Sequence, residues 1–301
     1  MVAFPLIQVG NALVHEALSV FPLVAPETSG ADYVLSEDAL AKGLMTVEEV
    51  NEAGSVPNLL VDNQAESPVL FLEGEELKGA KQNRILNTSV LVAARSKTTI
   101  PVSCVEQGRW RYHSRCFGLS GGHASSKMRH LLKKSLLRAA REGQGHRSDQ
   151  AAVWGEVCRQ MNFLGSSSPT DAMEDTYESH RNRLNEFRER LNYADGATGM
   201  AVGVGKQIVS VDVFDKPETC RQVWNRLLTG VIMDALELGP APDLAVAADA
   251  EKALQLLQGN SWQKTPAAGL GEEYRFETDG DWHAAALVFN DTVVHGSLLH
   301  A

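Results

Sequence analysis

The sequence lacks several features that mark specialised classes of protein. Its 301 residues contain no uninterrupted apolar run of spanning length, which excludes a transmembrane helix. Its four cysteines, Cys104, Cys116, Cys158 and Cys220, form no C-x-x-C pair and no zinc-ligand spacing, so we expect buried reduced thiols and no disulfide framework. No internal repeat or low-complexity tract is present, which argues against repeat architectures.

The amino-terminal stretch also lacks a targeting pattern. Met1 to Gly10 has no basic residue ahead of its apolar residues and no cleavage-site pattern, so we expect a cytoplasmic protein without membrane attachment. A hydrophobic fraction of 44% with 22% charged residues is typical of a folded globular chain. The formal charge of −10 favours solubility and argues against nucleic-acid binding over the whole surface.

Acidic residues are scarce in one segment of this acidic chain. From Gln107 to Arg147 there are ten basic residues and one acid, Glu142, so the segment carries a charge of +9. Such asymmetry often marks where an anionic partner binds. The alternatives are that these residues pair with the chain's own acids or with a second subunit.

The first part of the chain is predicted to be rich in strands. Alternating apolar residues and turn signals before residue 118 predict strands together with two short helices. The strands are expected at Asn11 to Leu18, Val20 to Ala25, Pro57 to Val61, Pro68 to Glu73, Thr88 to Ala94 and Thr99 to Glu106, and the helices at Ser36 to Ala41 and Thr46 to Ala53.

The second part is predicted to be rich in helices. Apolar residues at helical spacing from Ser125 to Glu142 are accompanied by a separate basic stripe. Further helices are expected from Ser148 or Asp149 to about Phe163, from Met173 to Leu191, from Pro217 onward, and around Ala245 to Leu257. A hairpin is expected from Met200 to Phe214, and strands are expected at Glu273 to Glu277, Ala284 to Phe289 and Val293 to Leu299. Segregated strands and helices favour an α+β fold with a β-rich, sandwich or barrel-like part at residues 1–122 and an α+β part at 123–301, unless the two form one continuous domain.

The polar stretch from Leu70 to Asn87 is the first candidate for a site. Strand alternation places Val69, Phe71, Glu73 and Glu75 on one face, so carboxylates continue a line of core residues. The loop after them contains Lys78, Lys81, Gln82, Asn83 and Arg84. Such a mixture suits the orientation of a polar ligand, although an exposed hairpin loop would have the same composition.

The second candidate stretch is Ile100 to Trp110. Glu106 shares a strand face with apolar residues, and a carboxylate there needs a partner, which Arg109 or Arg84 could supply. That pair would be either structural or arranged to hold a substrate phosphate or carboxylate. Cys104 is expected to be a buried small residue and not a nucleophile.

The third candidate stretch is Gly118 to Ser126, which precedes the basic helix. Its G-x-S-x-G letters, with Ser120 and the later Asp212 and His283 or His295, follow the order of a serine hydrolase, but the polar segment before it argues against a nucleophile elbow. An anion site at the helix start and a flexible capping loop remain as alternatives.

No metal site is expected from local spacing. His113, His123, His130 and His146 match no metal-ligand pattern, and no dinucleotide fingerprint identifies a cofactor.

Three segments carry a resemblance to a known family. The sequences LEGEELKGAKQNRILNTS and IPVSCVEQGRW, with the later VGKQIVSVDVF, resemble the ARG (ADP-ribosylglycohydrolase) and rhodanese-phosphatase-associated domain family of bacteria and archaea. The resemblance covers most of the chain and implies a role near ADP-ribose, NAD-derived or other phosphorylated metabolites. The matching polar positions are Glu75, Gln82, Asn83, Arg84, Glu106, Gly108, Arg109 and Trp110. No established activity or residue role comes with it.

The leading expectation is that the Glu75 to Arg84 loop and the Glu106 to Trp110 turn meet in one cleft beside Ser120 to Ser126. This cleft would bind a phosphorylated or nucleotide-like metabolite, with hydrolysis or group transfer if the protein is an enzyme. Glu75 or Glu106 is the expected general acid or base. The expected ligand-binding residues are Lys81, Gln82, Asn83, Arg84, Arg109, Trp110 and Ser120. The alternative is a non-catalytic interaction module in which the helix 125–142 docks an acidic protein or another copy of the chain.

Overall fold

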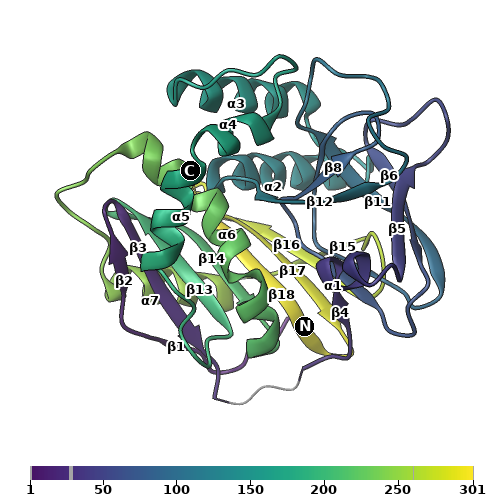
Figure 1. Ribbon diagram of the computed structural model, residues 1–301. Coiled ribbons are helices and arrows are strands. Elements are labelled where there is room, and N and C mark those ends of the chain that lie inside the picture. Colours follow the sequence, from purple (N-terminus) through teal and green to yellow (C-terminus); the bar gives the residue numbers. More distant parts are fainter. Residues whose placement is uncertain (1, 27–29, 260, 301) are drawn as a thin grey trace.

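The chain folds into strands and helices that form three sheets with helical cover (Figure 1). The computed structural model describes residues 2–26, 30–259 and 261–300, and within these ranges it contains seven helices and eighteen strands. The predicted α+β class, with a β-rich amino-terminal part, is confirmed.

The largest sheet combines strands from both ends of the chain. Its order is β1-β3-β13-β14-β18-β17-β16-β15, with β2 also paired to β3. The bounds of these strands are β1 Gln8–Val9, β2 Leu13–His15, β3 Leu18–Val24, β13 Gly199–Val204, β14 Gln207–Phe214, β15 Gln263–Thr265, β16 Glu272–Glu277, β17 His283–Phe289 and β18 Thr292–Leu299. The amino-terminal strands are therefore integral to a sheet whose other members follow residue 198.

The β-rich part forms two smaller sheets around a core of its own. One has the order β12-β8-β9-β11-β6-β5 and the other β10-β7-β4, and Leu59, Leu77 and Ile100 belong to the core between them. The bounds are β4 Val34–Leu35, β5 Met45–Glu49, β6 Asn58–Asn63, β7 Val69–Phe71, β8 Glu75–Gly79, β9 Arg84–Leu86, β10 Val90–Val92, β11 Ser96–Cys104 and β12 Phe117–His123.

Helices cover both faces of the large sheet. Alternate residues of β13 face opposite sides, so Met200 packs in the cluster that contains helix α6 and Ala201 in the cluster that contains α7. The helix bounds are α1 Ser36–Ala41, α2 Ser126–Arg141, α3 Gln150–Phe163, α4 Met173–Ser179, α5 Arg181–Arg190, α6 Pro217–Leu238 and α7 Ala247–Gly259. Figure 1 shows α2, α3 and α4 above the large sheet, where it meets the β-rich part.

Turn and cap chemistry explains several boundaries. The β17–β18 turn has positive φ at both Asn290 and Asp291, as a type I′ hairpin turn requires, and Asn and Asp tolerate that conformation. The predicted hairpin turn at Gly205 is confirmed, with φ +57 at this glycine. Pro217 occupies the first turn of α6, and Asp149 caps α3 by accepting a hydrogen bond from the Ala152 amide.

Three sequence predictions of local structure were wrong. The predicted helix from Thr46 to Ala53 is strand β5, in which Met45, Val47 and Glu49 are buried and the residues between them are more exposed. The helix predicted from Met173 to Leu191 is divided at His180 into α4 and α5. The stretch Gly118 to Ser126, treated as a loop, contains most of β12, whose main-chain pairing with β8 does not depend on side-chain type.

Helix length also bears on membrane insertion. Among the described residues, none of the helices is both long enough and apolar enough to cross a bilayer.

Candidate functional site

The two polar loops predicted to form a cleft do lie together. Glu106 joins them, because its Oε2 accepts hydrogen bonds from the Asn83 amide at 3.0 Å and from Arg109 Nη2 at 2.6 Å. Its Oε1 accepts from Arg109 Nε at 2.7 Å and from Thr170 Oγ1 at 2.9 Å. Gln82 completes the contact by donating to the Glu106 carbonyl oxygen at 2.9 Å. The Glu106 carboxylate is therefore fully engaged in holding the loops together.

Arg109 is engaged to the same degree. Its Nη1 donates to the carbonyl oxygen of Ala80 at 2.7 Å, and its Nη2 donates to Asn83 Oδ1 at 3.1 Å, in addition to the bonds with Glu106. Burial alone would raise the pKa of Glu106, but the hydrogen bonds from Arg109 and Asn83 lower it below its usual value. This geometry fits the structural reading of the Glu106–Arg109 pair.

Lys81, Arg84 and Trp110 form a separate group at the far side of this loop. The Lys81 ammonium lies 5.2 Å from the centre of the Trp110 ring, and it donates to the carbonyl oxygen of Ala53 at 2.8 Å. Arg84 is fully buried, and its Nε and Nη2 have no hydrogen-bond partner, while Glu49 lies 3.9 Å from Nη2. These residues surround one end of the loop. Among the residues that the structure describes, they form no hydrogen bond with Ser120.

Glu75 and Glu76 are neighbours on strand β8 with different surroundings. Glu75 accepts hydrogen bonds from Ser36 at 2.5 Å, Arg226 at 2.8 Å and the Leu72 amide at 2.9 Å, so both of its oxygens are engaged. Glu76 points the other way, as successive residues of a strand do. Its Oε2 accepts a hydrogen bond from Ser120 Oγ at 2.7 Å, and its Oε1 is buried without a partner.

The surroundings of Glu76 favour its protonated form. Burial raises the pKa of Glu76 to about 8, the nearby Glu174 contributes in the same direction, and the Ser120 hydrogen bond offsets part of the effect. A carboxyl group with a pKa near neutrality can donate or accept a proton at physiological pH. Such perturbed groups in a cleft are candidates for functional sites.

Glu76 and Ser120 line a cavity of about 220 Å³ between the end of β12 and helices α4, α5 and α6. We call it the Glu76 pocket. Its other lining residues are Gly121, Gly122, Glu174, Tyr177, Glu178, Arg181, Leu184, Arg188 and Thr229. The two polar loops reach it through Glu174, which accepts a hydrogen bond from Asn83 Nδ2 at 3.3 Å.

Arg188 gives the Glu76 pocket a cation that pairs with no carboxylate among the residues that the structure describes. Its Nη2 donates to Thr229 Oγ1, and its Nη1 donates to Asn185 at 3.4 Å, while Nε is buried without a partner. Burial lowers the pKa of Arg188, with no opposing contribution from an acid. Arg181, in contrast, pairs with Glu178. Arg188 is therefore the guanidinium best placed to receive an anionic ligand.

The glycine-rich end of β12 lets the backbone approach Glu76. A Cβ atom at Gly122 would lie 2.5 Å from Glu76 Oε2, so a side chain at this position would displace the carboxyl group. The Gly122 amide donates to Ser120 Oγ at 2.9 Å and fixes the hydroxyl between itself and Glu76. Gly121 has φ +77, and the β8–β12 register shifts between Leu119 and His123.

A match to a sequence-family model shows to which family the chain belongs. The model of the ARG and Rhodanese-Phosphatase-superfamily-associated Protein domain matches residues 6–299. The chain belongs to this family. The resemblance predicted from three segments is therefore confirmed, and the family match includes both the Glu76 pocket and the large sheet. No curated protein and no solved structure matches the chain.

Among the pocket residues that were not predicted from the sequence, Glu76 and Arg188 bear most on its chemistry. The sequence prediction selected Glu75 because it continues the face of Glu73, but Gly74, with φ +79, lies between them and interrupts the alternation. The adjacent glutamates Glu75 and Glu76 were the sequence signal for Glu76, because successive residues of a strand face opposite sides of the sheet. For Arg188, on a helix with many charges, no sequence signal was present.

The helix start behind β12 is satisfied by protein groups. Ser125 Oγ accepts from the Met128 amide at 3.2 Å, and Asp234 accepts from both the amide and the hydroxyl of Ser126 at 2.7 Å. Asp234 thus accepts the hydrogen bonds that an anion would accept at this helix end.

The basic face of α2 pairs with acids of the same chain. Lys127 contacts Glu237 at 2.5 Å, and Arg141 contacts Glu277 at 2.6 Å. The remaining pairs are Lys134 with Asp281, Arg138 with Asp149, and Arg129 and Lys133 with Glu73. Among the alternatives for this basic segment, the geometry favours internal pairing over docking of an acidic partner.

Asp212 and His295, which follow Ser120 in the order of a serine hydrolase, occupy a different buried cluster. His295 Nε2 lies 3.2 Å from Asp212 Oδ1, and its Nδ1 lies 2.7 Å from Ser89 Oγ. All three side chains are buried. The hydrogen bonds of Ser120 instead go to Glu76 and Gly122.

The raised pKa of Glu76 predicts how stability depends on pH. Because the folded pKa of about 8 exceeds the unfolded value of 4.5, the contribution of Glu76 is full below pH 4.5 and decreases as the pH rises toward 8. We expect Glu76→Gln to remove this pH dependence of the unfolding free energy, which amounts to roughly 3–5 kcal/mol between the unfolded and folded pKa values. Urea unfolding of wild type and variant between pH 5 and 8 measures the difference.

Burial also raises the pKa of Asp234 to about 7, so Asp234 contributes a pH dependence of the same sign. Because Asp234 is present in both wild type and Glu76→Gln, the difference between their stability curves reports on Glu76. Parallel stability curves for wild type and Glu76→Gln would show that Glu76 is ionised in the folded state.

Proposed function

We propose that the Glu76 pocket binds a phosphorylated metabolite of the ADP-ribose or nucleotide-like class and supports hydrolysis or transfer of a group on it. The observation that carries this proposal is the position of Arg188, a partly buried guanidinium without a carboxylate partner, in the same cavity as the Glu76–Ser120 pair. An anionic oxygen would satisfy the Arg188 Nε group that has no hydrogen-bond partner.

The size of the Glu76 pocket limits what it encloses. At about 220 Å³ it is smaller than the 300–1,000 Å³ that is usual for ligand pockets. It suits a phosphoryl group with a small attached moiety, so most of a dinucleotide would lie outside. This supports recognition of the phosphorylated end of the metabolite.

The proposed chemistry uses the protonated Glu76. In a hydrolysis, a water oxygen forms a bond to the transferred group while the bond to the leaving oxygen breaks. The leaving oxygen takes the Glu76 proton, and Glu76 regains a proton from the attacking water. Ser120 and the Gly122 amide orient the carboxyl group, and Arg188 stabilises negative charge on the transferred group.

Ligand binding is tested by thermal shift with inorganic phosphate, sugar phosphates, ADP-ribose and NAD. A ligand that binds the native state raises the melting temperature, and we expect a shift that is lost in Arg188→Gln. Arg190→Gln is the matched control, because Arg190 is exposed on the same helix and does not line the pocket. A shift that survives Arg188→Gln, or no shift with any of these compounds, contradicts the proposal.

Turnover is tested with the compounds that bind. We expect Glu76→Gln to retain the thermal shift and to lose turnover by about 10²–10⁴-fold, since the amide cannot donate the proton. Wild-type turnover should fall as the pH rises through 8, where Glu76 ionises. Undiminished turnover in Glu76→Gln would remove Glu76 from the mechanism and leave only the binding function.

A further inference from the structure

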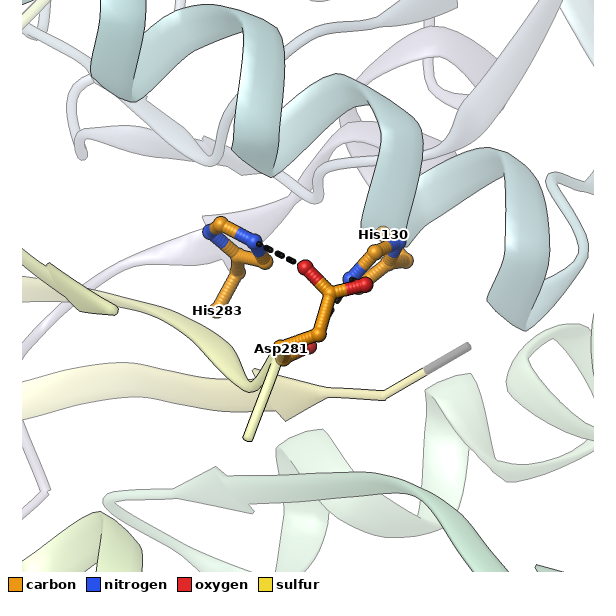
Figure 2. A group of neighbouring side chains, drawn as sticks. All are labelled: His130, Asp281 and His283. Carbon is orange, nitrogen blue, oxygen red and sulfur yellow. Dashed lines mark hydrogen bonds and ion pairs between the residues drawn. The ribbon is translucent and has the colours of Figure 1, made fainter. Parts of the chain in front are cut away.

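Two histidines and an aspartate from distant parts of the chain meet between α2 and the large sheet. His130 lies on α2, His283 begins β17, and Asp281 lies in the turn just before it. Figure 2 shows the Asp281 carboxylate between the two rings. Asp281 Oδ1 lies 3.2 Å from His283 Nε2, and Oδ2 lies 3.4 Å from His130 Nε2.

These distances match the spacing of ligands around a metal ion. Two ligands about 2.1 Å from a tetrahedrally coordinated ion lie about 3.4 Å from each other. One donor atom from each of the three residues lies within 4.8 Å of the other two. Small rotations of the side chains would therefore place all three donors on one ion.

Both imidazoles are buried beside Asp281. His283 and His130 are 3% and 5% exposed. His283 Nδ1 is buried without a hydrogen-bond partner. Glu277 Oε2 lies 3.8 Å from this atom. In many metal sites a carboxylate orients a ligating histidine by contacting the ring nitrogen that does not bind the metal.

A cavity beside the cluster leaves room for a further ligand. It has a volume of about 510 Å³, and its lining includes His130, Lys134 and Glu277. Three protein ligands with one open position are usual in catalytic zinc sites, where two histidines and one carboxylate are a common set.

We propose that His130, Asp281 and His283 bind one divalent transition-metal ion. Three existing contacts compete with the ion. The Lys134 ammonium lies 3.2 Å from Asp281 Oδ1, His283 Nε2 donates to the same oxygen at 3.2 Å, and His130 Nε2 donates to the Asp281 carbonyl oxygen at 2.9 Å. The Lys134 side chain is 61% exposed and can turn to solvent, and each neutral imidazole binds the ion through Nε2 as the tautomer that carries its proton on Nδ1.

The sequence expectation of no metal rests on short-range spacing. Short-range spacing does not detect ligands that only the tertiary structure brings together, as with α2 and the turn before β17. The proposed ion is independent of the Glu76 pocket, whose lining contains none of the three ligands.

The test uses the full-length chain without a polyhistidine tag, treated with a chelator and then titrated with Co²⁺ and, separately, Zn²⁺. We expect a single equivalent of Co²⁺ to produce visible d–d absorption, and Zn²⁺ to abolish it by displacement. His283→Asn and His130→Asn should each weaken binding by at least about tenfold, the lower end of the effect of altering a metal site. His113→Asn, which changes an exposed histidine outside the cluster, is the control.

Lys134→Gln supplies a second and opposite readout. Removing the ammonium that contacts Asp281 should tighten Co²⁺ binding, an effect that adventitious capture by surface histidines would not show. The far-ultraviolet circular dichroism of each variant confirms folding before titration. The proposal is overturned if the wild-type chain shows no stoichiometric absorption, or if folded His130→Asn and His283→Asn bind Co²⁺ as tightly as His113→Asn.

Discussion

Arg129→Met is expected to destabilise the protein by about 3–5 kcal/mol, because it leaves the buried Asp212 without its main counter-charge and the buried Glu73 without one of its two cationic partners. Arg129 Nη2 donates to Glu73 at 2.7 Å and to Asp212 at 2.5 Å, and Nη1 donates to Asp212 at 3.0 Å. All three side chains are no more than 3% exposed. Methionine fills much of the volume of the arginine stem, so lost packing contributes little.

The electrostatics of this cluster explain the size of the effect. Burial alone would raise the pKa of Glu73, but Lys133 and Arg129 together lower it to about 2. Burial acts in the same way on Asp212, and there Arg129 is the largest opposing influence and lowers the pKa well below its usual value. In Arg129→Met, the side-chain partner that remains for Asp212 Oδ1 within the described ranges is His295.

Urea unfolding measures the prediction, and Arg141→Met is its matched control. Arg141 lies on the same helix and pairs with Glu277 at 2.6 Å, but its side chain is 51% exposed, so we expect a change of less than about 1 kcal/mol. Similar values for the two variants would contradict a special role for the buried cluster.

The pH dependence gives an independent check on Arg129→Met. The depressed pKa values of Glu73 and Asp212 contribute stability in the wild type that is present above their unfolded values, near 4, and is lost as the pH falls. That contribution is reduced in Arg129→Met. The deficit of the variant should therefore be full at pH 7 and smaller at pH 3.

Local sequence patterns were sufficient to predict where α2 and α6 begin. The apolar stripe of α2 and the proline at the start of α6 fixed these helices to within a residue or two at their first turns. Strand β5 was mistaken for a helix because its five residues include Glu48 and Glu49, although Met45 and Val47 show the strand period. In β12, glycine replaced the side chains that would have shown any period.

The candidate site was predictable only in part, because its contacts join distant segments. The meeting of the Gln82 loop with the Glu106 turn was predicted. Gln82 lies just before β9 and Glu106 just after β11, and these two strands pair with each other. The pocket itself depends on α6 packing against β12 and on α5 packing against α6, and nothing in the sequence around Arg188 indicates that packing. Similarly, Glu73, between β7 and β8, and Asp212, in β14, meet Arg129 from distant parts of the chain, so their polar character was visible but their pairing was not.

Gly230→Ala is expected to destabilise the protein by at least about 3 kcal/mol, at the upper end of the usual cost of overpacking. A Cβ atom at Gly230 would lie 2.2 Å from the Ala124 carbonyl oxygen and 3.1 Å from that of His123. Both neighbours are backbone atoms at the end of β12, so the clash cannot be relieved by a side-chain rotation. Either α6 or the end of β12 must move.

Gly155→Ala is the matched control for this prediction and is expected to have the opposite sign. Gly155 lies on the exposed face of α3, and a Cβ atom there meets nothing within 4 Å. The same chemical change should therefore stabilise the protein by about 0.5–1 kcal/mol, because alanine loses less backbone entropy in a helix than glycine does. Urea unfolding of the two variants side by side measures both effects.

The Gly230 substitution also connects the packing of α6 with the Glu76 pocket. Thr229, the preceding residue, lines the pocket and accepts a hydrogen bond from Arg188, while Gly122, near the end of β12, holds Ser120 against Glu76. Any shift that accommodates a methyl group at residue 230 separates these two walls. Folded Gly230→Ala should therefore also lose the ligand-induced thermal shift proposed for the pocket. Gly155→Ala should keep it, and equal shifts in both variants would show that the pocket does not depend on this contact.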